Sequence, residues 1–294
     1  MYILNNFEYF APETRSEALE LAKKLGSKAK ILAGGTDLII QLKEKMITTE
    51  NIINISGVDE FKGISCEPGK GAVIGACTKI ADIEYSEALR KKYPALSFAA
   101  GEIGGPQVRS MATLGGNSCH SSPAAETPSP LSALGAIVVI SSKSGDREVP
   151  IEEFILGNRK NVLAEGEIVT KFVLPEPAPK SANRYAYIGL RNAMEIDAVN
   201  MAVNLVLEND GETIKAIKLV MGSVFPRPLI SEKIPALLIG KKLNDELVEQ
   251  AAEVAQSEAK PITDVRASAE YRRDVVATLT RRLLKEAYAA AKEA

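Results

Sequence analysis

The chain has 294 residues, of which 46% are hydrophobic and 25% are charged, and its formal net charge is −2 at pH 7. It is about twice the length of an ordinary domain, so two domains are expected. The small net charge argues against an extensive basic surface and therefore against a nucleic-acid partner. The sequence has no apolar run of membrane-spanning length and no export signal at the N-terminus, which predicts a cytoplasmic protein without membrane insertion.

Three cysteines and one histidine limit the metal chemistry of this chain. Cys66, Cys77 and Cys119 are odd in number and scattered, which does not fit a disulfide framework. An iron–sulfur cluster normally takes four thiolates, and His120 is the single histidine available for a zinc site. We therefore expect no metal ligands here, and any redox chemistry would use an organic cofactor or metals held by another chain.

The first section of the chain predicts an alternation of helices and strands. A capping box at 14–17, apolar residues at helical spacing and Gly26 at the end together predict a helix. A short strand is expected at 31–33, a second helix at 38–42 and a second strand at 51–55. These elements form one unit.

A second section begins near Gly57. Strands are predicted at 72–76, 137–140, near Val149 and at 168–174, and helices at 86–93 and 94–100. Between them lies the segment 101–130, which is rich in Gly, Ser, Pro and Thr and long for a surface loop inside a domain. Loops of this length are usually functional or disordered, and the apolar runs on either side favour a functional segment.

Residues 175–179 (Pro-Glu-Pro-Ala-Pro) predict a linker. Three extended runs follow it, at 184–190, 199–207 and 214–221, and they predict a small antiparallel sheet. Helices are expected at 245–258 and from 269 to the C-terminus. The chain therefore ends in a second, compact α+β domain.

Two paired-glycine motifs stand out. The first, Gly34-Gly35-Thr36, lies between a predicted strand and a predicted helix. Paired glycines allow a ligand to approach the backbone and tolerate positive φ angles. The amides at the start of the helix suit a diphosphate, and the Thr36 hydroxyl adds a donor. A plain tight turn is the alternative for an isolated Gly-Gly pair.

The second motif, residues 112–118 (Ala-Thr-Leu-Gly-Gly-Asn-Ser), lies inside the segment 101–130. Two such elements in one domain could hold the two ends of a dinucleotide. Neither motif matches the Rossmann G-x-G-x-x-G pattern or the phosphate loop that ends in lysine. Nicotinamide binding by the usual fold and ATP hydrolysis are therefore disfavoured.

The strings 31–38, 105–109 (Gly-Pro-Gln-Val-Arg), 113–117 and 264–273 closely resemble the FAD-binding, or medium, subunits of the xanthine dehydrogenase and carbon monoxide dehydrogenase family. The resemblance covers nearly the whole chain. It implies an α+β protein with a two-part FAD-binding domain of the vanillyl-alcohol-oxidase/PCMH type at 1–176, divided at about 56. A C-terminal domain at 181–294, with a three-stranded antiparallel sheet plus helices, would follow it.

The resemblance also implies which residues bind FAD, without a covalent bond. The first motif would bind the diphosphate mainly through backbone amides, and we expect the Asp37 carboxylate to point away from it. The second motif would contribute the Thr113 and Asn117 side chains and two glycine amides. The full set of expected FAD-binding residues is Leu32, Ala33, Gly34, Gly35, Thr36, Asp37, Leu38, Ile103, Thr113, Gly115, Gly116, Asn117, Glu126 and Tyr187.

Three of these positions depart from the family pattern. Glu126 stands where the family usually has an aspartate that accepts hydrogen bonds from ribose hydroxyls, and a solvated loop charge is the alternative. Ile103 replaces an aromatic residue of the animal xanthine enzymes, and Tyr187 replaces a lysine near the ring or adenine. Tyr185, Tyr187 and Arg191 are candidates to cover the flavin, with ordinary strand packing as the alternative.

Several other residues have weaker functional interpretations. His120 invites comparison with covalent flavin linkage, which is disfavoured because this family holds FAD non-covalently. Cys119 could lie near FAD without a redox role. The pairs Arg272-Arg273 and Arg281-Arg282 predict a solvated helix face or a contact with a partner subunit.

The resemblance implies an electron-transfer function. Substrate would be hydroxylated at a molybdopterin centre on a large subunit, and electrons would pass through two [2Fe-2S] clusters on a small subunit to this FAD. The flavin would then reduce an external acceptor such as NAD or a quinone. No catalytic residue is expected on this chain, and the assembly is expected to be a dimer of heterotrimers.

Two alternatives remain at this stage. One is a stand-alone FAD-dependent reductase or oxidase of the same fold, resembling the enolpyruvyl-glucosamine reductases. The other is a scaffold subunit that has lost its flavin, against which the intact glycine motifs argue. The additional iron–sulfur cluster of the hydroxybenzoyl-CoA reductase flavin subunits is not expected, because three scattered cysteines cannot hold it.

Overall fold

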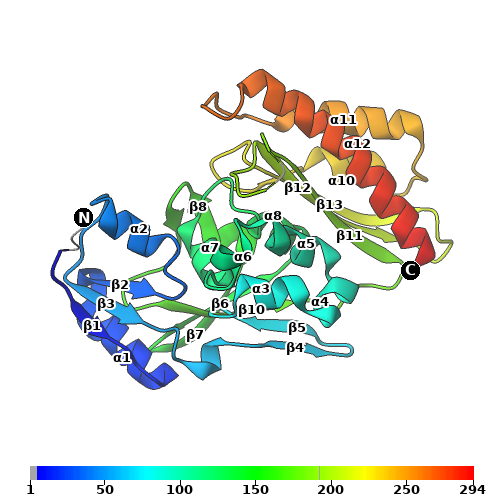
Figure 1. Cartoon of the computed structure of the whole chain (residues 1–294). Coiled ribbons are helices and arrows are strands. Elements are labelled where there is room, and N and C mark those ends of the chain that lie inside the picture. The colour runs from blue at the N-terminus through cyan, green and yellow to red at the C-terminus, as the bar shows by residue number, and fades with distance from the viewer. Residues whose placement is uncertain (1–4, 192) are drawn as a thin grey trace.

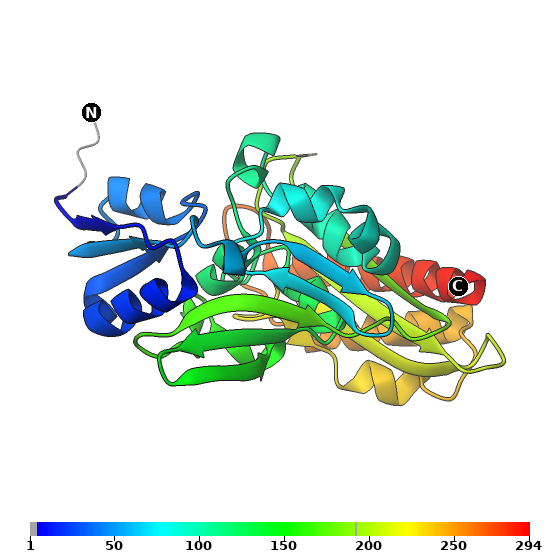
Figure 2. The same ribbon diagram turned by 90° about the horizontal axis from the view of Figure 1, so that it is seen from below.

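The computed structural model describes residues 5–191 and 193–294. Three successive units follow one another along the chain, and Figure 2 shows the first unit and the C-terminal helix at opposite ends of the molecule. Among the described residues, no helix combines the length and the hydropathy that a membrane span needs.

The first unit is a three-stranded parallel sheet with helices beside it (Figure 1). The strand order is β1-β3-β2, and both outer strands run parallel to β3. The predicted capping box is present, because the Thr14 side chain accepts a hydrogen bond from the Glu17 amide at 3.3 Å. The elements are β1 (Glu8–Phe10), α1 (Arg15–Leu25), a 3₁₀ turn (Gly26–Lys28), β2 (Ala29–Leu32), α2 (Leu38–Lys43) and β3 (Asn51–Asn54).

The second unit is built on a five-stranded antiparallel sheet in the order β4-β5-β10-β6-β7. Its strands are β4 (Ile64–Glu67), β5 (Gly71–Gly75), β6 (Ile137–Ser142), β7 (Gly145–Pro150) and β10 (Ile168–Leu174), with a small hairpin of β8 (Ile155–Gly157) and β9 (Lys160–Asn161). Its helices are α3 (Ile80–Tyr85), α4 (Glu87–Lys92), α5 (Pro94–Glu102), α6 (Pro106–Arg109), α7 (Leu114–His120), α8 (Pro128–Ala133) and α9 (Ile151–Phe154), after a 3₁₀ turn (Asp59–Phe61).

The segment 101–130, which the composition predicts as a long loop, is largely helical. It contains α6, α7 and the start of α8. Short helices that begin with proline or a threonine cap use the same residue types as loops, which is why composition does not separate the two.

The third unit is a four-stranded antiparallel sheet, β11-β12-β13-β14, covered by helices. The two-residue strand β14 adds to the three strands predicted from the sequence, and Ile230 in it pairs with Val220. The elements are β11 (Ser181–Ile188), β12 (Val199–Leu207), β13 (Ile214–Gly222), β14 (Leu229–Ile230), α10 (Lys233–Leu238), α11 (Asp245–Glu258) and α12 (Ala269–Glu293).

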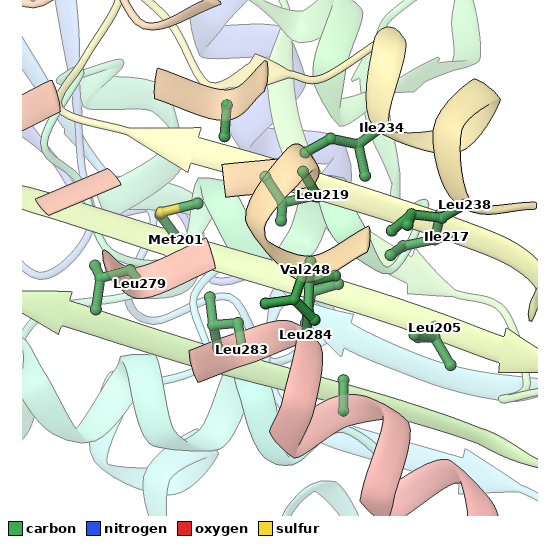
Figure 3. Packing of buried hydrophobic residues seen from close by; sticks show 14 of the residues in the cluster. Met201, Leu205, Ile217, Leu219, Ile234, Leu238, Val248, Leu279, Leu283 and Leu284 are labelled. Carbon is green, nitrogen blue, oxygen red and sulfur yellow. The ribbon is translucent and has the colours of Figure 1, made fainter. Parts of the chain in front are cut away.

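The third unit has two packed faces. Helices α10, α11 and α12 bury one face of the sheet, and Figure 3 shows Met201 and Leu219 of the strands against Val248 and Leu284 of the helices. On the other face, small residues of α5 and α8 pack against Tyr185. This second contact packs the C-terminal sheet against helices of the second unit.

Candidate cofactor-binding site

The first glycine motif lines a cavity of about 460 Å³. It occupies the turn between β2 and α2, where Gly35 has a φ of +74° that side chains rarely adopt. Within the described chain, the backbone amides of residues 34–38 donate no hydrogen bond to a protein acceptor. Because unpaired amides that face a cavity require an acceptor, this turn is suited to a ligand rich in oxygen atoms.

The start of the second motif and the residue before it pack directly on the first. A Cβ atom added to Gly34 would lie 2.2 Å from the Met111 carbonyl oxygen and 2.9 Å from the Ala112 Cα. Only a glycine permits this approach of two backbones. The two motifs, about eighty residues apart in the sequence, therefore form one wall of the same cavity.

The second motif forms the beginning of α7. Thr113 is the N-cap, and its hydroxyl accepts a hydrogen bond from the Gly116 amide at 3.1 Å. The Gly115 amide donates to the Ala76 carbonyl at 2.8 Å. These two glycine amides, expected from the resemblance to face the ligand, are thus bonded within the chain. Thr113 and Asn117 keep side-chain groups at the cavity.

A side-chain contact joins the two motifs across the cavity. The Asp37 carboxylate lies 2.8 Å from Nδ1 of His120 at the end of α7, and it also accepts a hydrogen bond from Gln41. Half of the Asp37 side chain is exposed. The carboxylate that the sequence predicts to turn away from a phosphate is therefore held by two neighbours that also line the cavity.

A second hollow of about 670 Å³ lies beside the first, and Val108 lines both. One of its walls comes from the second unit and includes Gly104 and Glu126. The opposite wall comes from the C-terminal domain: Leu190, Arg191, Met194, Glu195, Ile196 and Arg266. The two hollows together offer an elongated site with one end at a domain interface, which is a frequent place for cofactors.

A buried arginine shapes the loop between the two hollows. Arg109 is 8% exposed, and its Nε donates to Glu84 at 2.6 Å. Its Nη1 donates to the carbonyls of Ile103 and Gly104, at 3.2 and 3.1 Å. In the sequence, Arg109 stands out only as part of a motif, because its role depends on a partner that is 25 residues away.

Two buried carboxyls lie near the second hollow. Burial raises the pKa of Glu126, which is 8% exposed, to about 7. Burial and then the Glu126 charge raise the pKa of Asp197 to about 8, and the Tyr185 hydroxyl donates to Asp197 at 3.1 Å. Tyr187 donates its hydroxyl hydrogen bond to Glu102 and stacks on Tyr185.

Most of the residues expected at the site lie together. Ile103, Thr113, Gly115, Gly116 and Asn117 line the first cavity with residues 33–38, and Glu126 lines the second hollow. Among the described residues, the linings of the two hollows do not include Leu32 or Tyr187. The lining residues that sequence reasoning missed are Lys30, Ile31, Gln41, Ile47, Ile55, Ala76, Cys77, Val108, Arg159, Leu163, Glu167, Ile168 and Val169.

The fold and the paired hollows define a two-domain α+β protein in which the unpaired backbone amides of residues 34–38 lie in a cavity suited to an elongated, oxygen-rich ligand. Residues 5–177 match the family described as the FAD binding domain in molybdopterin dehydrogenase. Residues 184–287 match the CO dehydrogenase flavoprotein C-terminal domain. The chain belongs to this family of FAD-binding subunits of molybdenum hydroxylases, and it is an oxidoreductase subunit.

Individual relatives are similar in sequence to this chain over almost their full length. The carbon monoxide dehydrogenase medium chain of Hydrogenophaga pseudoflava is 33% identical over 283 residues, which cover 96% of this chain and 97% of that one. The xanthine dehydrogenase FAD-binding subunit of Escherichia coli O157:H7 is 31% identical over 96% of both chains. A solved structure of the Hydrogenophaga pseudoflava carbon monoxide dehydrogenase superposes with a TM-score of 0.92 and 32% identity, covering 98% of this chain and 99% of that one.

Proposed function

We propose that this chain binds FAD non-covalently and transfers electrons through it. The electrons would come from [2Fe-2S] clusters on a small subunit and leave to an external acceptor such as NAD or a quinone. The observation that carries the proposal is the run of unpaired amides at residues 34–38, which lies in a cavity that shares the lining residue Val108 with the hollow at the domain interface.

The residues present fit an FAD molecule. The amides of residues 34–38 and the hydroxyls of Thr36 and Thr113 would bind the diphosphate. Asn117 and Glu126 offer polar groups to a ribose or ribityl diol. The bound flavin would supply the capacity to accept electrons singly or in pairs, while the protein binds and orients it.

Apolar and aromatic residues would surround the ring end. Ile103 is 7% exposed and covers one side of the first cavity with an aliphatic surface. Tyr187 would support the site without contacting the ligand: its ring stacks on that of Tyr185, with centroids 6.4 Å apart. Leu32 would pack against the first motif, because its Cδ1 lies 3.2 Å from the point that a Cβ atom on Gly35 would occupy.

We also propose that the chain works in a larger assembly. The molybdopterin centre would lie on a large subunit and the clusters on a small subunit, in a dimer of heterotrimers. The relatives named above, a medium chain and an FAD-binding subunit, support this assignment. We propose domain limits of 1–176 and 181–294, with the proline-rich linker between them.

The decisive test compares two glycines with the same backbone conformation. Gly35 and Gly69 have φ angles of +74° and +76°, and at Gly69 a Cβ would meet nothing within 4 Å. Gly35→Val and Gly69→Val should therefore carry similar backbone strain, of about 1–2 kcal/mol. Only Gly35→Val should abolish FAD binding, measured as flavin absorbance per chain after purification and by titration of the FAD-free chain.

The outcomes separate the alternatives. A colourless wild-type chain that does not take up added FAD would refute the proposal, and normal flavin content in Gly35→Val would refute the site assignment. Gly116→Val should also lose FAD, because its Cβ would lie 3.0 Å from the Thr113 hydroxyl oxygen. Copurification with molybdenum and iron–sulfur subunits supports the electron-transfer role, whereas a yellow monomer that turns over a substrate alone favours a stand-alone oxidoreductase.

A further inference from the structure

Five acidic or phenolic side chains gather where α5 and α8 meet the C-terminal sheet. We call Glu102, Glu126, Tyr185, Tyr187 and Asp197 the acid cluster. Glu102 is the last residue of α5, Glu126 precedes α8, both tyrosines lie on β11 and Asp197 precedes β12. Glu126 and Asp197 are buried, at 8% and 3% exposure. Because Glu126 lines the second hollow, the cluster borders the proposed FAD site.

The members of the cluster are connected to one another. Tyr185 donates to Asp197 at 3.1 Å, and Tyr187 donates to Glu102. The two tyrosine rings lie 6.4 Å apart at 30°, so the two hydrogen-bonded pairs are neighbours. The charge of Glu126 acts on Asp197, and the charge of Glu102 acts on Glu126. The charge state of Glu126 therefore affects the charge state of Asp197.

Nearby cations do not neutralise the cluster. Arg191 lines the hollow with Glu126, but its guanidinium donates to backbone carbonyls of its own loop. Arg266 binds Asp264, and the buried Arg272 binds Asp264 and the carbonyls of Ala198 and Ser223. Glu195 accepts hydrogen bonds from the amides of Leu190 and Arg191. Among the described residues, no Lys, Arg or His forms an ion pair with Glu102, Glu126 or Asp197.

Burial without a cation has a direct physical consequence. Two carboxylates in a water-poor region repel each other and lose hydration, so protonated forms persist to higher pH than in water. Glu126 and Asp197 therefore take up protons at higher pH than exposed carboxyls do. Added negative charge in the adjoining hollow would increase its affinity for protons.

We propose that the acid cluster is a redox-linked proton site, which binds one proton from solvent when the adjoining FAD is reduced. This inference rests on the proposed function. Two electrons enter from one-electron carriers, which are iron–sulfur clusters in the assembly and dithionite in vitro. One proton from water would join the flavin, and a second would form an O–H bond on the carboxylate of either Glu126 or Asp197. The second proton offsets the charge that reduction brings to the hollow.

The test counts protons in the FAD-loaded chain. Dithionite reduction in weakly buffered solution with a pH indicator should consume about two protons per flavin near neutral pH, after correction for the reductant. The midpoint potential should then fall by about 60 mV per pH unit, because each proton per two electrons contributes about 30 mV. Asp197→Asn should lower both values, to about one proton and about 30 mV.

Two further variants and an infrared measurement serve as controls. Glu126→Gln should act like Asp197→Asn, and Asp197 lines neither hollow, so it remains informative if the Glu126 variant binds FAD poorly. Glu148→Gln, an exposed position on β7, should leave proton uptake unchanged. Redox-difference infrared spectra should show a protonated-carboxyl band in the wild type that Asp197→Asn loses.

Failure of this inference is distinguishable from failure of the proposed function. A chain that binds no FAD refutes the proposed function. A chain that binds FAD but takes up only one proton across pH 6–9, or whose two cluster variants keep the wild-type proton count, refutes the redox-linked site alone.

Discussion

The buried arginine of α6 gives the sharpest prediction on how this fold supports its site. The side chain of Arg109 is 10% exposed and that of its partner Glu84 is 14% exposed. The guanidinium bonds both oxygens of that carboxylate and also two backbone carbonyls of the loop that carries Ile103. Removing the guanidinium would release the loop between the two hollows and leave a carboxylate buried without a partner.

The size of the effect follows from these contacts. Truncation of one member of a buried ion pair costs about 3–5 kcal/mol, out of a total of about 5–15 kcal/mol for a typical domain. Arg109→Lys keeps the charge but loses the planar fork that reaches the carboxylate and both carbonyls. Hydrogen bonds to charged groups are worth about 1.5–3 kcal/mol each, so we expect a loss of at least about 2 kcal/mol.

The assay is urea unfolding of the FAD-free chain, combined with FAD titration under conditions where each variant is folded. Arg281→Lys is the matched control, because its 2.7 Å pair with Glu249 is about half exposed, and it should cost less than about 1 kcal/mol. Arg109→Lys should also weaken FAD binding at least about tenfold, a difference of about 1.4 kcal/mol. Equal stability and equal FAD affinity in Arg109→Lys and Arg281→Lys would show that the pair does not position the loop.

Three further predictions follow from the site. Burial raises the pKa of Glu126 and Asp197, so these two carboxyls bind protons more tightly in the folded chain than in the unfolded chain. Their contribution to stability is complete below the ordinary carboxyl pKa and is lost as pH rises through their folded pKa values of about 7 and 8. In urea unfolding of FAD-free protein, the free energy should therefore fall as pH rises toward 8, and it should fall less steeply in Asp197→Asn. Burial raises the pKa of Cys77 to about 12, so this thiol should not react with iodoacetamide at about pH 8 until the protein unfolds, as mass spectrometry would detect. His120→Asn should weaken FAD binding by less than about tenfold, because its contact with a half-exposed carboxylate is worth little, and acid precipitation of the wild type should release all the flavin.

The sequence predicted those helices and turns that depend only on residues close together in the chain. The helix capped at Thr14 and the turn at Gly35 depend on neighbouring residues, and both are present. The resemblance added the pairing of the two glycine motifs, which no local rule provides. Contacts set by sheet register were not predictable, since Ala76 and Val169 reach the cavity only because β5 and β10 are adjacent. The structural role of Arg109 was not predicted for a similar reason, because its partner Glu84 is distant in sequence.

The two glycine motifs look alike in sequence but act differently. Gly35 needs its backbone conformation and leaves amides free, whereas Gly115 is required for packing, since an added Cβ would lie 2.8 Å from both the Cβ and the carbonyl oxygen of Ala76. Its amide is bonded to that same carbonyl. Gly115→Ala should therefore destabilise the fold by about 1–3 kcal/mol through overpacking.

The same reasoning predicts that Ala76→Gly partly restores the stability of Gly115→Ala, because it removes one of the two close contacts. FAD affinity per folded molecule should change little in either variant, since the Gly115 amide does not face the ligand. Urea unfolding and FAD titration measure the two quantities separately. A Gly115→Ala chain of normal stability but weak FAD binding would mean that this amide contacts the diphosphate, and the division of roles between the two motifs would be wrong.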